Sequence, residues 1–172
     1  MSKTLVLYYS RSGENYAHGS TEYLVQGRTA VMAKLIAERT GAELFEVEPD
    51  TPYPENYLRT TEVVEEEFTN GSTRRSAAPV PDLSGFDTIF IGHPIWWGRM
   101  PPVFTQALEA ADFSGKTIHH FCTHEGSGFG STESELHRAA KGAMFGGSLA
   151  VQGTQVDRSA SKIDVWLNKL GF

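Results

Sequence analysis

Two adjacent tryptophans, Trp96 and Trp97, are the side chains of this sequence that point most directly to a ligand. They follow the apolar run 89–92 and lie in a turn, 94–100, that contains proline and glycine. Turns are built mostly from Gly, Pro, Asn, Asp and Ser, and each indole buries roughly 150–250 Å² when it is covered. We therefore expect the pair to cover a flat aromatic ring, with one indole facing the ligand; the alternative is that one or both fill the core.

A second turn, 10–15, carries hydroxyl and amide groups on Ser10, Ser12 and Asn15. A helix is predicted to begin near Thr29, and a helix N-terminus offers unpaired N–H groups and a partial positive charge. Together these groups suit a phosphate. The alternative is that they only cap the helix and turn the chain.

A third turn, 124–130, contains three glycines whose backbone N–H groups are free to meet the polar edge of a ring. In this turn Glu125 either accepts a hydrogen bond from an imide N–H or is solvated. His119 and His120 precede the turn and are expected to be packed or surface residues, and Cys122 is expected to be a core thiol. No spacing of His, Cys, Asp and Glu indicates a metal site.

Five short apolar runs must position these turns. They lack polar alternation, which is typical of strands buried on both faces. The predicted strands are 4–9, 42–47, 86–92, 116–123 and 143–151, the last weakened by two glycines, and helices follow them at about 29–40, 57–68, 101–111, 132–142 and 159–170. This alternation predicts a mostly parallel sheet with helices on both faces. The polar stretch 16–27 intervenes before the first helix.

The three turns all leave carboxyl ends of predicted strands, so a parallel sheet brings them to one edge, where such sheets bind ligands. The Walker pattern is absent, and so is the G-x-G-x-x-G pattern after the first strand, which argues against a nicotinamide-binding Rossmann domain. A phosphate pocket, aromatic walls and a group that binds a polar ring edge describe a site for a phosphorylated planar heterocycle. Flavin mononucleotide (FMN) fits this description best.

Composition limits the classes of partner and the cellular compartment that we expect for this protein. The chain has 172 residues, and we expect one domain spanning 1–172. Its 15 basic and 21 acidic residues give a net charge of −6, which disfavours nucleic acid and anionic membranes as partners and suits a basic partner. A single cysteine, no apolar run long enough to span a membrane and no visible secretory signal lead us to expect a cytoplasmic protein.

Three motifs resemble the flavodoxin family, and more narrowly a bacterial flavodoxin-like group. They read Tyr8-Tyr9-Ser10-Arg11-Ser12-Gly13-Glu14-Asn15, Trp96-Trp97-Gly98-Arg99-Met100-Pro101 and Phe121-Cys122-Thr123-His124-Glu125-Gly126-Ser127-Gly128. The resemblance implies an α/β fold, a three-layer α/β/α sandwich with a five-stranded parallel sheet in the order 2-1-3-4-5, and FMN as cofactor. The first motif would hold the phosphate, the second would flank the isoalloxazine ring, and the third would meet its pyrimidine edge.

The resemblance also implies a set of FMN-binding residues, with no catalytic side chain and no metal. They are Ser10, Arg11, Ser12, Gly13, Asn15, Tyr16, Thr29, Ala30, Pro94, Ile95, Trp96, Trp97, Gly98, Thr123, His124, Glu125, Gly126, Ser127 and Gly128. The chain departs from the family pattern at the inserted residues 16–27 and at Arg28, which stands where related sequences have Asn and either approaches the phosphate or points away.

Two functions are compatible with these expectations. The first is an electron-transfer flavoprotein that shuttles between redox partner proteins, and the acidic charge favours it. The second is an FMN-dependent oxidoreductase that takes hydride from NAD(P)H and reduces a quinone or a similar acceptor. A third reading, a receiver-type signalling domain, ranks low because Gly92 and His93 stand where such a domain needs an Asp.

Overall fold

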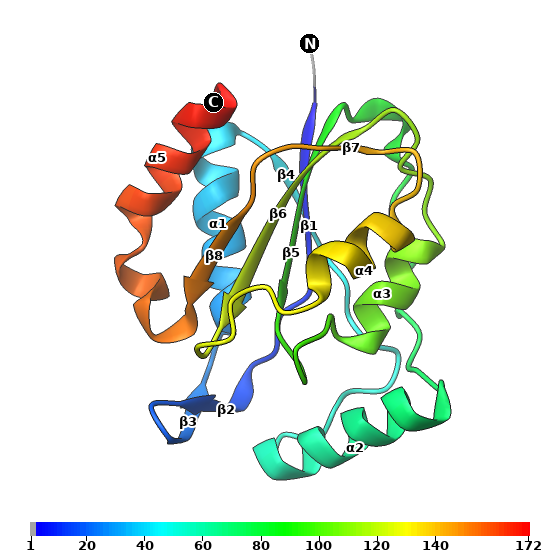
Figure 1. The fold of residues 1–172 in the computed structure, drawn as a ribbon, viewed down its shortest axis with the longest axis vertical. Helices are drawn as coiled ribbons and strands as arrows, with labels where there is room; N and C mark the ends of the chain where they lie inside the picture. Colours follow the sequence, from blue (N-terminus) through cyan, green and yellow to red (C-terminus); the bar gives the residue numbers. More distant parts are fainter. Residues whose placement is uncertain (1–2) are drawn as a thin grey trace.

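A parallel sheet forms the centre of the protein, whose computed structural model describes residues 3–172 (Figure 1). Its strands are β1 (Thr4–Tyr8), β4 (Glu43–Glu46), β5 (Thr88–Pro94), β6 (Thr117–His124), β7 (Met144–Phe145) and β8 (Leu149–Gln152). They lie in the order β4-β1-β5-β6-β7, and β8 also pairs with β6. Every pair in this sheet is parallel. With the predicted strands numbered along the chain, this is the expected order 2-1-3-4-5.

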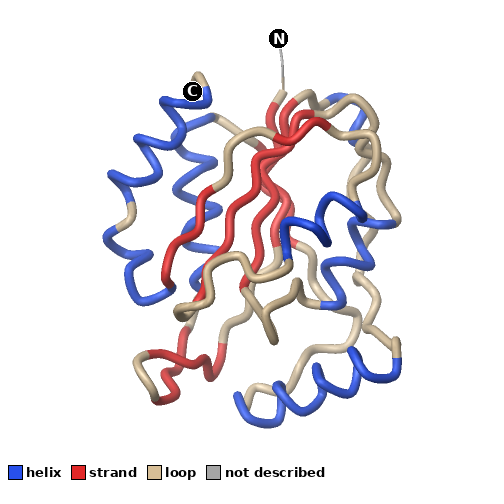
Figure 2. The backbone as a smooth tube through the Cα atoms, in the orientation of Figure 1, coloured by secondary structure: helices blue, strands red, loops and turns tan. Residues whose placement is uncertain are grey.

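Helices cover both faces of the sheet (Figure 2). On one face α1 (Arg28–Thr40) and α5 (Ala160–Leu170) pack against Val6, Phe90 and Phe121. On the other face α3 (Pro102–Glu109) and α4 (Thr132–Ala139) pack over Leu7 and Ile91. Neighbouring strand residues serve opposite faces because side chains alternate along a strand. The predicted three-layer α/β/α sandwich is confirmed.

The fifth predicted strand is interrupted. Instead of one strand over 143–151, β7 and β8 pair with separate parts of β6, and the segment Gly146–Ser148 lies between them. Gly146 packs against the His119 ring so closely that a Cβ there would lie 2.3 Å from the ring carbon Cε1. The two glycines therefore mark a bend of the chain around His119, and the five expected strands become six.

Two elements extend beyond the carboxyl ends of the strands, at the bottom of Figure 1. One is α2 (Tyr57–Asn70), and the other is an antiparallel hairpin of β2 (Gly13–Ala17) and β3 (Ser20–Leu24). The hairpin occupies most of the polar stretch for which no element was predicted. His18 and Gly19 form its two-residue turn with φ of 50° and 81°, values typical of a type I′ hairpin.

The hairpin is tied to the start of α2. The Glu14 carboxylate accepts hydrogen bonds of 3.0 Å from both the Tyr57 backbone N–H and the Asn56 side-chain amide. The Tyr16 ring stacks on Tyr57 with centroids 6.0 Å apart and an interplanar angle of 29°. Hairpin and helix therefore form a continuous rim at this edge of the sheet. Two short 3₁₀ helices, η1 (Leu83–Gly85) and η2 (Gly153–Arg158), complete the fold.

Among residues 3–172, no helix combines the length and the apolar character needed to cross a bilayer.

Candidate functional site

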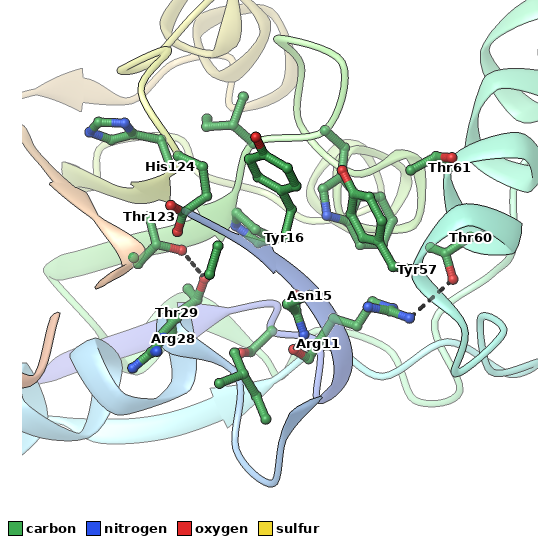
Figure 3. Close-up of a pocket in the computed structure, with 18 of the residues that line it drawn as sticks. Arg11, Asn15, Tyr16, Arg28, Thr29, Tyr57, Thr60, Thr61, Thr123 and His124 are labelled. Atoms are coloured by element: carbon green, nitrogen blue, oxygen red, sulfur yellow. Dashed lines mark hydrogen bonds between the residues drawn. The ribbon is translucent and has the colours of Figure 1, made fainter. Parts of the chain in front are cut away.

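A cavity of about 420 Å³ lies at the carboxyl ends of β1, β5 and β6, between the hairpin and α2 (Figure 3). Each of the three predicted turns contributes to its wall. The residues that were predicted as ligand-binding and that line the cavity are Ser10, Arg11, Asn15, Tyr16, Thr29, Pro94, Ile95, Trp96, Trp97, Thr123, His124 and Glu125. The sheet thus brings the three turns together as expected, while the role of each residue toward FMN stays a prediction.

Other predicted residues do not line the cavity: Ser12, Gly13, Ala30, Gly98, Gly126, Ser127 and Gly128. The third turn folds on itself, because Gly126 N–H donates to His124 Nδ1 and the Ser127 hydroxyl donates to Gly128 O. The carbonyl of Gly98 turns toward α4, where it accepts from the backbone N–H of Ser131.

The cavity also contains residues that the sequence did not single out. They are Ala17, Glu22 and Leu24 from the hairpin, Tyr57, Leu58, Thr60, Thr61 and Val64 from α2, and Gly153. Arg28 of α1, whose direction the sequence left open, also lines the cavity. The α2 group was missed because α2 was expected to lie against a face of the sheet, whereas it lies across the carboxyl edge. The spacing of Tyr57, Thr61 and Val64 shows in the sequence that they share one face of a helix. It does not show which other element of the fold that face packs against.

Hydroxyl groups and a helix N-terminus gather at one end of the cavity. The Ser10 hydroxyl accepts from Ala30 N–H at 3.0 Å, which leaves its own proton free to donate. The Thr29 and Thr123 hydroxyls lie 2.7 Å apart and share one hydrogen bond, so one of their two protons is also free. Helix α1 begins after Gly27, which has no side chain to cap it, so the N–H groups of Arg28 and Thr29 remain available to a ligand, whereas Ala30 N–H is bonded to Ser10.

Gly27 lets the first turn approach the helix. A Cβ at this position would lie 2.2 Å from Ser10 Oγ and 2.6 Å from Arg11 O, so a larger residue would push the turn away. Arg11 then anchors the turn to the rim, because its guanidinium donates to Pro54 O at 2.7 Å and to Glu55 O at 2.8 Å. The polar end of the cavity is therefore held by contacts from several elements.

The two tryptophans have different environments. Trp96 is half-buried and meets the rings of Tyr9 and Tyr53 edge-on, with centroids 5.4 and 5.0 Å apart. Trp97 is 60 % exposed, and its indole N–H donates to Thr61 O at 3.3 Å. One indole thus packs on the core and the other lies at the cavity mouth, while which of them faces a ligand stays a prediction.

A tight turn presents Trp97. The backbones of Trp96 and Arg99 exchange both hydrogen bonds, of 2.9 and 3.0 Å, and the intervening Trp97 and Gly98 have φ of 53° and 70°. These features define a type I′ turn. A φ above zero is strained for an L-residue other than glycine, so the surrounding contacts hold Trp97 in this conformation.

A buried carboxylate on α4 holds the chain that leaves this turn. Glu135 is 5 % exposed and accepts from Met100 N–H at 3.3 Å and from the Ser131 hydroxyl at 3.0 Å. The Arg99 guanidinium lies 3.4 Å from the same carboxylate and covers the Phe68 ring. The tryptophan turn is therefore fixed by α4 as well as by α2.

Two buried histidines lie under the same turn, on β5 and β6. His93 Nδ1 is 2.8 Å from Pro94 O, and the Nε2 atoms of His93 and His120 are 2.7 Å apart. The carbonyl can only accept, so His93 carries its proton on Nδ1 and His120 donates from Nε2. Burial lowers the pKa of His93 to about 4 and, together with repulsion from His93 and His137, that of His120 to about 2. Both rings are neutral at pH 7.

His119 and His120, which were expected to be packed or surface residues, are both buried. Cys122 is a buried thiol as expected, and burial raises its pKa to about 12. No group of three or more His, Cys, Asp and Glu side chains within residues 3–172 is arranged to hold a metal ion.

Glu125 lies at the polar end of the cavity. Its Oε1 atom would be 2.3 Å from a Cβ on Gly153, so the absence of a side chain at that position creates its space. Burial raises the pKa of Glu125, and the nearby charges of Arg28 and His18 oppose this shift. Whether this carboxylate meets an imide N–H stays a prediction.

Comparison with known proteins shows which family and which solved structures this chain is similar to. A family profile described as Flavodoxin matches residues 3–170. A protein from Bacteroides uniformis ATCC 8492, provisionally described as a flavoprotein, has 27% sequence identity and a TM-score of 0.72, over 97% of this chain and 98% of its own. A flavoprotein from Lactobacillus acidophilus NCFM, solved in complex with FMN, has 22% identity and a TM-score of 0.67, over 92% and 98%.

A protein from Klebsiella pneumoniae, provisionally described as a quinone reductase, is similar in fold, with 14% identity and a TM-score of 0.54 over 98% of this chain and 85% of its own. A search of curated proteins found no match. Fold and site together define an α/β protein with a cavity at the carboxyl edge of its parallel sheet. Because the family profile spans nearly the whole chain, the protein belongs to the flavodoxin family.

Proposed function

We propose that this protein binds FMN in the carboxyl-edge cavity and carries electrons between redox partner proteins. One observation carries the proposal: a single cavity joins a hydroxyl-lined helix N-terminus at one end to an exposed indole at the other. Membership of the flavodoxin family supports it, and so does the shared fold of a flavoprotein crystallised with FMN.

The residues present fit the two ends of FMN. Thr29, Thr123 and Arg28 lie at one end of the view in Figure 3, where free hydroxyl protons and the N–H groups of α1 suit a phosphate. Tyr57 and Thr61 lie at the other end, where the Trp97 indole bonds to Thr61. Aromatic side chains at this end suit the isoalloxazine ring because stacked rings attract each other.

Bound FMN supplies the electron-accepting and electron-donating chemistry. The chain would contribute binding: the hydroxyls would hold the phosphate end, and the turn at Trp97 would place an aromatic side chain beside the ring. The buried His93–His120 pair lies behind Pro94 and outside the cavity wall, so its part is to support the turn.

The charges near the cavity favour a carrier over an NAD(P)H oxidoreductase. Glu65 and Glu66 are exposed on α2, where Glu62 is paired with Arg59, and Glu55 is exposed just before the helix. NAD(P)H is an anion, and these carboxylates repel it, whereas they attract a partner protein with a basic surface. The exposed Leu58 and Trp97 side chains offer apolar contact between the charges.

A visible spectrum tests the proposal. Protein incubated with FMN and then desalted should absorb near ~450 nm, a property of the bound flavin. Adding NADH or NADPH to the same cuvette without oxygen should leave the flavin absorbance near ~450 nm unchanged if the protein is a carrier. Rapid bleaching would instead support the oxidoreductase, and a colourless protein after desalting would overturn FMN binding itself.

A further inference from the structure

Arg28 is the first residue of α1 and lies in the cavity wall next to Thr29. Its guanidinium bridges two carboxylates: Nη2 lies 3.2 Å from Glu22 Oε2, and Nη1 lies 3.1 Å from Asp157 Oδ2. The Arg28 side chain is 19 % exposed, so most of its surface is already in contact with protein. It is thus a positioned cation at the end of the cavity that suits a phosphate.

The two carboxylates differ in their relation to the cavity. Glu22 belongs to β3 of the inserted hairpin and lines the cavity, whereas Asp157 belongs to η2 and lies outside the wall. Their side chains are 49 % and 69 % exposed. Ion pairs of such exposed groups contribute little to stability, so either carboxylate can be exchanged at small cost.

A phosphate bound at the start of α1 would be close to two negative side chains in the cavity wall, Glu22 and Glu125. Arg28 and Arg11 are the cations in that wall, and the Arg11 guanidinium already donates to carbonyls of the chain before α2. Arginine binds phosphate through two parallel hydrogen bonds, which are stronger than a single contact to a carboxylate. Arg28 is therefore the group able to offset the charge of a dianion at this end.

We infer that Arg28 selects ligands that carry a phosphate dianion, and that it does so by exchanging its ion pair with Glu22 for one with the phosphate. Asp157 keeps its contact on the outer side and holds the guanidinium in place. The inserted hairpin then has a defined part in binding, because its β3 strand is released from α1 when the phosphate takes the place of Glu22. The inference rests on the proposed FMN site and deepens it.

The experiment compares FMN with riboflavin, which has the same ring system and no phosphate. Dissociation constants for both are measured by titration of flavin fluorescence. Arg28→Gln should weaken FMN binding by about tenfold or more, the scale of a charge-assisted bidentate contact, and leave riboflavin binding unchanged. Glu22→Gln should strengthen FMN binding by about two- to fivefold and leave riboflavin unchanged, because it removes the competing exposed ion pair.

Asp157→Asn is the matched control. It removes one negative charge from the same guanidinium but at a carboxylate outside the cavity, so its effect on FMN affinity should be smaller than that of Glu22→Gln. Equal effects of the two substitutions would overturn the exchange. The inference also fails if Arg28→Gln weakens FMN and riboflavin binding by the same factor.

The same measurements distinguish failure of the proposed FMN binding from failure of the inference about Arg28. If the unmodified protein binds neither flavin, FMN binding is wrong and this inference falls with it. If it binds both flavins and their affinity ratio does not depend on Arg28 or Glu22, FMN binding stands and only the selection by Arg28 is wrong. Should Arg28→Gln fold poorly, the Glu22→Gln arm decides alone, since that side chain is half exposed.

Discussion

The turn at Trp97 allows ligand contact and backbone strain to be separated by two substitutions at one position. Trp97→Ala and Trp97→Gly both remove the indole from the cavity mouth. They differ in the backbone, because φ of 53° strains alanine and not glycine. We therefore expect the two variants to bind FMN equally and to differ in stability.

The magnitudes follow from the geometry. An aromatic contact contributes about 0.5–1.5 kcal/mol, so both variants should bind FMN roughly two- to tenfold more weakly. A left-handed conformation costs an L-residue about 1–2 kcal/mol, which destabilises the alanine variant. The greater freedom of glycine in the unfolded chain destabilises the glycine variant by about 0.4–1 kcal/mol and so opposes this difference. From the central values of these two ranges, about 1.5 and about 0.7 kcal/mol, Trp97→Gly should be more stable than Trp97→Ala by about 0.8 kcal/mol.

Trp96→Ala is the contrasting substitution. Trp96 is half-buried and packs edge-on against Tyr9 and Tyr53 at the border between core and cavity, so truncation removes these contacts. Truncation of a fully buried aromatic side chain costs about 3–5 kcal/mol, and we expect about 2 kcal/mol for this half-buried one. Its main effect should therefore be on the free energy of unfolding, whereas the exposed Trp97 indole contributes little to that quantity.

Two assays measure these effects: FMN titration by fluorescence quenching, and urea unfolding of the protein without added FMN. The assignment of the two indoles is refuted if Trp96→Ala weakens FMN binding at unchanged stability while Trp97→Ala does not weaken it. The assignment of strain is refuted if Trp97→Ala is as stable as Trp97→Gly or more stable.

Two further predictions concern the core beneath the cavity. Burial lowers the pKa of His93 from 6.5 to about 4, so the unfolded chain binds a proton more readily in this range, and roughly 3 kcal/mol of stability present above pH 6.5 should be lost as the pH falls to 4. Urea unfolding at several pH values checks this; parallel curves for the protein and for the double variant His93→Leu/His120→Leu would contradict it. Gly92→Ala should destabilise the protein by about 1–3 kcal/mol in thermal unfolding, because its Cβ would lie 2.0 Å from Cζ of Phe121; an unchanged Tm would show that the ring moves freely.

The sheet was predictable because its strands are buried on both faces. Runs such as Thr4–Tyr8 and Thr88–Pro94 contain little polar alternation, and that pattern is typical of a central parallel strand. The strand order came from the family resemblance, and the structure confirms it. The break at Gly146 was not predicted, because nothing in the sequence says that His119 fills the space there.

The hairpin could not be predicted from hydrophobic pattern. The β3 sequence Ser20–Leu24 is almost entirely exposed and has no buried face to set a period. One available signal was the His18-Gly19 pair, since glycine after a residue that tolerates positive φ is typical of a two-residue hairpin turn. Its strands are held by contacts with α1 and α2, which depend on tertiary structure.

The part of the candidate site that follows directly after the ends of the strands could be predicted. The turns after β1, β5 and β6 meet because parallel strands share one edge, and their first residues line the cavity. The glycines of the third turn were expected to meet the polar edge of a ring. In the structure Gly126 N–H donates to His124 Nδ1, and the contact of these glycines with a ligand stays a prediction. The direction of the Arg28 side chain was left open. It depends on ion pairs with Glu22, which belongs to a hairpin that was not predicted, and with Asp157, which is distant in the sequence.

The interruption of the fifth strand also bears on aggregation. An exposed strand at the edge of a sheet offers unpaired N–H and C=O groups to other chains, and long uninterrupted edges are the hazardous ones. Here one edge is β4, four residues long with exposed Glu43 and Glu46. The other edge is divided into β7, of two residues, and β8, of four, by the bend at Gly146–Ser148. A substitution that straightened this segment would create one continuous edge from 144 to 152 and should raise the tendency of the protein to form intermolecular sheets.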